Sequence, residues 1–105
     1  MINIIKCSKI IVKNSAWVVT RWRLDANRND MYTTNKDTLL GQQTTIDLKA
    51  LGIQQGIQFA VKANIVAYLG NDALSDVILE YSEESNVTIT LKLTGTTFEI
   101  WFKKV

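Results

Sequence analysis

Alternation of apolar and polar residues is the feature that most constrains how this chain folds. It runs through the segments 57–69 and 87–94 and returns at 97–104. The apolar positions of the first segment are Ile57, Phe59, Val61, Ala63, Ile65, Ala67 and Leu69. A period of two puts successive side chains on opposite faces of a β-strand, one face buried and the other in water. The sequence therefore predicts an all-β fold.

Turn residues divide the chain into short strands. Proline is absent, so Gly, Asn and Asp mark the breaks. Strands are predicted at 2–13, 16–25, 31–34, 43–48, 57–69, 76–81, 87–94 and 97–104. About seven to eight short strands without a long helix favour one domain over residues 1–105. We expect an antiparallel two-sheet β-sandwich of immunoglobulin-like proportions, with a small β-barrel as the alternative.

Two of these strands contain an irregularity. The 57–69 strand would extend about 43 Å at about 3.3 Å per residue, which is longer than most strands. A bend or bulge near Ala63-Asn64 is therefore predicted, which would let the strand serve two sheets. The 2–13 strand changes parity around Lys6, Ser8 and Lys9. That change predicts a second bulge or a crossing between sheets.

Two local motifs are clearer. The segments on either side of Gly95-Thr96 both alternate, which is typical of a β-hairpin. The segment 48–53 predicts a single helical turn, capped by Asp47 and ended by Gly52. The layout resembles that of compact β-sandwich lectins and cytolysins, and no motif in the chain is specific to either.

Composition argues against an enzyme. The chain has no histidine, which removes the commonest general base and the commonest metal ligand. Its single cysteine, Cys7, excludes an internal disulfide and multi-cysteine zinc sites, and we expect it in the core. Twelve basic against ten acidic side chains give a net charge of +2, too little to indicate nucleic-acid binding. No cofactor or metal site is expected.

Two acidic segments resemble functional sites in part. The loop 25–30 resembles the start of a calcium loop, but Lys36 stands where the bidentate glutamate is required. The stretch 80–84 carries several carboxylates without the enclosed cleft that acid/base catalysis needs. We interpret the first as an ordinary turn and the second as a solvated loop.

The predicted strand 16–25 has the most unusual surface. Its inward face is expected to carry Val18, Thr20, Trp22 and Leu24. Its outward face would carry Trp17, Val19, Arg21 and Arg23, and Trp101 repeats an outward aromatic on the last strand. Exposed aromatics beside arginines suit stacking on sugars, lipid head groups or a protein hot spot. Alternatively, Arg21 and Arg23 pair with Asp25 and Glu99 across strands.

Three functional classes follow, of which the first is favoured. It is a non-catalytic, lectin-like binding module that recognises a glycan, a lipid head group or a protein through Trp17, Arg21, Arg23 and Trp101. The second is a structural subunit that self-assembles through the same face as a homo-oligomer. The third is a pore-forming or membrane-lytic protein.

Location is the last expectation. The first residues lack a signal peptide, and nowhere do about eighteen apolar residues run together, so no transmembrane span is expected. The sequence therefore predicts a cytoplasmic protein or one released without a signal peptide.

Overall fold

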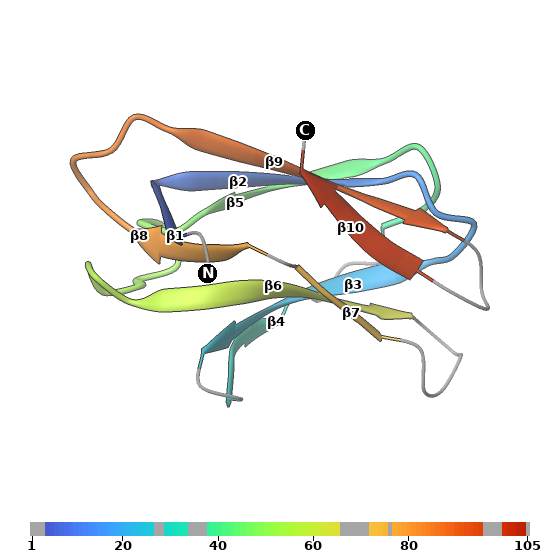
Figure 1. Cartoon of the computed structure of the whole chain (residues 1–105), viewed down its shortest axis with the longest axis horizontal. Coiled ribbons are helices and arrows are strands. Elements are labelled where there is room, and N and C mark those ends of the chain that lie inside the picture. Colours follow the sequence, from blue (N-terminus) through green and yellow to red (C-terminus); the bar gives the residue numbers. More distant parts are fainter. Residues whose placement is uncertain are drawn as a thin grey trace.

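The chain folds into two β-sheets packed face to face (Figure 1). This computed structural model describes residues 4–26, 29–33, 38–65, 72–75, 77–95 and 100–104. The first sheet runs in the order β1 (Ile4–Cys7), β8 (Ile78–Tyr81), β6 (Gln58–Ile65), β3 (Thr20–Ala26) and β4 (Asn29–Thr33), with β7 (Asp72–Leu74) also paired to β6. The second runs in the order β10 (Ile100–Lys104), β9 (Thr88–Gly95), β2 (Lys9–Asn14) and β5 (Gln43–Asp47). The predicted β-sandwich is confirmed, and the barrel alternative is not what forms.

The predicted interruption near Ser8 is a crossing between the two sheets. β1 lies in the six-stranded sheet and β2 in the four-stranded sheet, with Ser8 between them. The chain from β8 to β9 makes the same crossing alongside, so β1 pairs with β8 and β2 with β9 in parallel. Two backbone hydrogen bonds join the crossings, from the Ser8 amide to the Val87 carbonyl (3.1 Å) and from the Ser82 amide to the Cys7 carbonyl (3.0 Å).

The bulge predicted near Ala63-Asn64 does not form, because β6 pairs with β3 in unbroken register through both residues. The end of the predicted 57–69 strand, from residue 66 on, lies outside the described part of the chain, and the described partners of β6 belong to the six-stranded sheet. The irregularity lies in the chain beside β6, where the sequence predicted a strand only from residue 76. There β7 and β8 share one edge of β6 and are separated at Ser75, whose hydroxyl accepts a hydrogen bond from the Val61 amide (3.0 Å).

The core fills the space between the sheets. Trp22 of β3 and Phe102 of β10 meet across it, with ring centroids 6.0 Å apart. The inward positions predicted for the segment 16–25 are confirmed, since Val18, before β3, and Thr20, Trp22 and Leu24, within it, are all buried. Cys7 is a free, fully buried thiol, as expected of a small core residue.

The predicted helical turn after β5 also forms. The Leu51 amide donates to the Asp47 carbonyl (3.2 Å), and the Asp47 carboxylate accepts from the amides of Lys49 (3.1 Å) and Ala50 (3.3 Å). Gly52 ends the turn at φ 76°, a left-handed conformation that favours glycine. Among the residues with described structure, none forms a helix long and apolar enough to cross a membrane.

Candidate binding site at one end of the sandwich

Asn14, the last residue of β2, organises one end of the sandwich. Its side chain is buried, and its Nδ2 donates to the carbonyls of Val18 (2.7 Å) and Thr38 (2.9 Å). Its Oδ1 accepts from the amide of Ala16 (3.0 Å). An Asn side chain that takes up nearby backbone groups in this way competes with strand pairing. The strand predicted over 16–25 therefore begins only at Thr20, and residues 15–19 form a loop.

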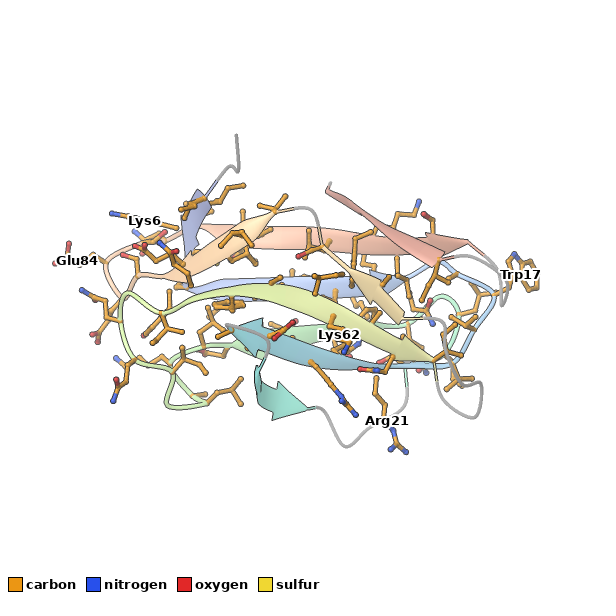
Figure 2. All side chains as sticks on the ribbon, turned by 60° about the horizontal axis from the view of Figure 1, so that its bottom comes forward. Lys6, Trp17, Arg21, Lys62 and Glu84 are labelled. Atoms are coloured by element: carbon orange, nitrogen blue, oxygen red, sulfur yellow. The ribbon has the colours of Figure 1, made fainter. Side chains whose placement is uncertain are left out.

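Trp17 lies at the outermost part of this loop. Its side chain is 72% exposed, and Figure 2 shows it projecting from the end of the molecule. Its backbone is held in place: the Trp17 amide donates to the carbonyl of Gly95 (3.0 Å), and the Ser15 amide donates to that of Leu93 (2.8 Å). A large apolar side chain is thus displayed from an anchored backbone.

A second loop, residues 38–42, lies beside the first. Thr38 is buried and exchanges two backbone hydrogen bonds with Thr20 (3.1 and 2.9 Å). Its hydroxyl accepts a hydrogen bond from Nε1 of Trp22 (3.0 Å). The next two residues, Leu39 and Leu40, are 49% and 45% exposed.

Asn14 joins the two loops through its backbone as well. Its amide donates to the Gln42 carbonyl (2.9 Å), and its carbonyl accepts from the Gly41 amide (2.8 Å). The end of the sandwich therefore displays Trp17, Leu39 and Leu40 from two loops fixed to one buried residue. We call these three side chains the apolar tip. It carries no ionisable group, so it suits an apolar ligand or surface rather than catalysis.

The arginines predicted to accompany Trp17 lie elsewhere. Arg21 is exposed and Arg23 half-buried on the outer face of the six-stranded sheet, where Arg23 pairs in register with Lys62. Figure 2 shows Arg21 pointing away from that face, well apart from Trp17 at the end of the molecule. Because residues 15–19 leave the strand, the structure does not bring Trp17 together with Arg21 and Arg23 as one outward row.

Trp101 belongs to the other sheet. It lies in β10 and pairs with Thr94 of β9, while both arginines are in β3. Its side chain lies outside the described part of the chain. Since the Trp17 amide bonds to Gly95, the backbones of both tryptophans adjoin the end of β9. The four predicted binding residues are therefore divided between the two sheets and the end of the sandwich.

The other candidate sites hold little chemistry. Burial raises the pKa of the Cys7 thiol from 9.0 to about 11, so it is neutral and unreactive at ordinary pH. In the acidic stretch, Glu80 accepts a hydrogen bond from Gln58 (3.0 Å), and Glu83 pairs with Lys49 (3.3 Å). Residues 27–28 of the possible calcium loop lie outside the described part, and the described residues contain no cluster of metal ligands.

Sequence reasoning missed Asn14, Leu39 and Leu40. Asn14 read as a turn residue, because its partner Thr38 is distant in the sequence. A signal for the leucines was present: Leu39-Leu40 is an apolar pair followed by Gly41 in a segment assigned to no strand.

No protein-family model matches the sequence, and comparison with curated protein sequences finds no match. Solved structures do resemble it. Wild-type pneumolysin is 12% identical at a TM-score of 0.53, over 93% of this chain and 23% of that chain. The human-specific toxin intermedilysin is 13% identical at 0.52, over 93% and 23%. The membrane-binding domain of pneumolysin is 13% identical at 0.50, over 93% and 95%.

These likenesses show a shared fold. The chain spans about a quarter of the intact toxins (23% of pneumolysin) and nearly all of the isolated domain (95%). Its fold is therefore that of one domain of those toxins.

Proposed function

We propose that this chain is a non-catalytic module that binds lipid membranes by inserting its apolar tip into the interface. The observation that carries the proposal is the tip itself. Trp17, Leu39 and Leu40 are exposed together on two loops that the buried Asn14 holds in place. Exposed apolar side chains on a rigid frame lower the free energy of the system when a partner removes them from water.

A bilayer interface suits these side chains. Tryptophan is enriched at membrane interfaces, where its ring is apolar and its N–H stays near water. Transfer of a leucine-sized side chain out of water contributes about 1.5–3 kcal/mol when burial is complete. Three such side chains, already partly buried and opposed by the loss of free motion, give a reversible rather than permanent attachment.

The comparisons support the same activity. One structural neighbour is named as the membrane-binding domain of pneumolysin, and it matches this chain over 95% of its length. Binding, rather than pore formation, is the activity proposed, because the chain corresponds to 23% of intact pneumolysin. Of the two locations expected from the sequence, we propose release from the cell, since a neighbour is named as a toxin.

The test is co-sedimentation with phosphatidylcholine vesicles, combined with the tryptophan emission of the protein, to which Trp17 is one of three contributors. We expect the wild type to partition onto vesicles with a blue-shifted emission. The variants Trp17→Ser and Leu39→Ser/Leu40→Ser should each bind at least about tenfold more weakly, since the first removes the tryptophan ring and the second removes both leucine side chains from the apolar tip.

Val87→Ser is the matched control. Val87 is 46% exposed, close to the 45% of Leu40, but it lies at the opposite end of the sandwich beside Ser8. It should bind as the wild type does. Equal losses in Val87→Ser and the tip variants, or no wild-type binding to any vesicle, would overturn the proposal.

A second candidate function rests on the outer face of the six-stranded sheet. Arg21, Arg23 and Lys62 place three cationic side chains there on two adjacent strands. This arrangement favours recognition of a protein or glycan, and one neighbouring structure is that of intermedilysin with human CD59. Binding to glycan or glycoprotein arrays that survives Trp17→Ser but is lost in Arg21→Ala would select it. If the protein instead self-associates through this face, its molecular mass in solution should fall on dilution.

A further inference from the structure

The outer face of the four-stranded sheet carries two neighbouring lysines close to the apolar tip, which we call the lysine row. Lys13 of β2 stands in register with Lys92 of β9. Lys13 is exposed and Lys92 half-buried. The buried neighbours Val12, Leu91 and Leu93 occupy the inward parity, so Lys13 and Lys92 face outward from the sheet.

Among the residues that the structure describes, no carboxylate stands beside Lys13 or Lys92 on this face. Neither Lys13 nor Lys92 takes part in the ion pairs Lys6–Glu80 and Lys49–Glu83. On the described outward face, the one carboxylate is Asp47, which stands opposite Lys9 at the far end of β2 and β5. Like charges side by side on a sheet are destabilising. A basic row kept without compensation therefore points to an anionic partner.

The distance from the tip identifies the kind of partner. Lys13 precedes Trp17 by four residues, and Lys92 precedes Gly95, the hydrogen-bond partner of Trp17, by three. At about 3.3 Å per residue, the row lies about 10 Å behind the tip. Apolar groups at a membrane surface penetrate about 5–10 Å into the boundary between head groups and acyl chains. An inserted tip therefore brings the lysines to the depth of the lipid phosphates.

We propose that Lys13 and Lys92 form a contact site for the head groups of anionic phospholipids, which makes the module selective for negatively charged membranes. The proposal rests on the proposed function, because the tip sets the depth at which the lysines meet the membrane. Ammonium groups attract lipid phosphates as point charges and need no shaped pocket. Attraction of this kind weakens as the salt concentration rises.

The experiment compares vesicles of phosphatidylcholine alone with vesicles that also contain phosphatidylserine. The wild type should bind the anionic vesicles more tightly, by about fivefold for each lysine, and the advantage should shrink with added salt. Lys13→Gln/Lys92→Gln should lose this advantage and keep its binding to phosphatidylcholine. Its melting temperature should stay level or rise, since the substitution relieves repulsion between neighbours.

Lys9→Gln is the control, because Lys9 lies on the same strand and face but stands opposite Asp47. It should retain the preference for anionic vesicles. Equal wild-type binding to both vesicle types, or an equal loss in Lys9→Gln, would overturn the lysine site while leaving the tip intact. If inorganic phosphate reduces vesicle binding more than chloride does at equal ionic strength, the lysines bind free phosphate, and a membrane as their partner is overturned. Unimpaired binding by Trp17→Ser would instead reject the proposed function.

Discussion

The two ends of the sandwich are both built from loops, yet they display opposite chemistry. The tip end presents Trp17, Leu39 and Leu40 and is fixed from within by Asn14. The opposite end, formed by the loops 48–57 and 82–87, is tied by exposed polar contacts. Lys49 pairs there with Glu83 (3.3 Å), whose amide donates to the Gln55 side chain (3.3 Å). Figure 2 shows Glu84 and Trp17 at these two ends.

This difference shows that a loop can be held rigidly whether its exposed side chains are polar or apolar. A loop whose surface is polar can be held by its own surface contacts, as at the 48–57 end. The loops of the apolar tip have one such contact, from the Leu39 amide to the Gln42 side chain (3.0 Å), and their other side-chain anchors lie inside the protein. The burial of Asn14 and Thr38 beneath the apolar tip fits that requirement.

The largest effect is expected from removing the buried anchor. Asn14→Ala deletes three side-chain hydrogen bonds and leaves the Val18 carbonyl and the Ala16 amide unpaired, while the Thr38 carbonyl keeps its bond from the Thr20 amide. Each buried group left unsatisfied costs about 1–3 kcal/mol, so the free energy of unfolding should fall by about 2–4 kcal/mol. Urea denaturation measures the loss.

Asp47→Ala is the comparison at the other end. It removes two hydrogen bonds to the amides of Lys49 and Ala50, both exposed, and should cost about 1 kcal/mol. If both variants lose the same amount, the distinction between internal and surface anchoring is wrong.

A smaller effect concerns Cys7, which lies where β1 crosses between the sheets. Its pKa is raised from 9.0 to about 11, so below pH 9 the thiol is protonated in both the folded and the unfolded chain. Between these values the unfolded chain releases the proton and the folded chain keeps it. Stability should therefore fall with rising pH, by about 2–3 kcal/mol in all.

The check is the slope of unfolding free energy against pH in the wild type and in Cys7→Ala. Lysines and tyrosines titrate in both proteins, so the difference between the slopes belongs to the thiol. Identical slopes would contradict the raised pKa. In the native protein at pH 8, a thiol reagent should react only as fast as the crossing opens.

The smallest effect is expected where exposure is greatest. Trp17→Ser changes a side chain that is 72% exposed and leaves its backbone hydrogen bond in place. The free energy of unfolding should change by no more than about 0.5 kcal/mol, as for Val87→Ser. A much larger loss by chemical denaturation would mean that Trp17 serves stability, which would weaken the contrast between the ends.

The sequence predicted those parts of the fold that local periodicity controls. Trp22 and Leu24 lie inward as their parity required, and Cys7 lies in the core. The change of parity around Ser8 marked a real crossing, because a one-residue shift turns every following side chain to the other face.

The candidate site depended on contacts that periodicity does not encode. The alternation of residues 16–25 predicts a strand that includes Trp17. The Asn14 side chain instead holds residues 15–19 as a loop, through hydrogen bonds to the carbonyls of Val18 and Thr38. The bulge predicted in β6 fails for a related reason. It was inferred from the length of the alternating run alone, whereas the pairing with β3 passes through Ala63 and Asn64 in unbroken register.

The paired crossings bear on how the molecule reaches its native state. β1 completes its pairing only when Ile4 meets Ile78, and β2 only when Lys9 meets Thr88. Contacts between such distant segments are slow to form, because the chain loses much entropy before they contribute. During synthesis β1 must therefore wait for β8, and β2, which can pair earlier with β5, keeps one edge open until β9 has been made.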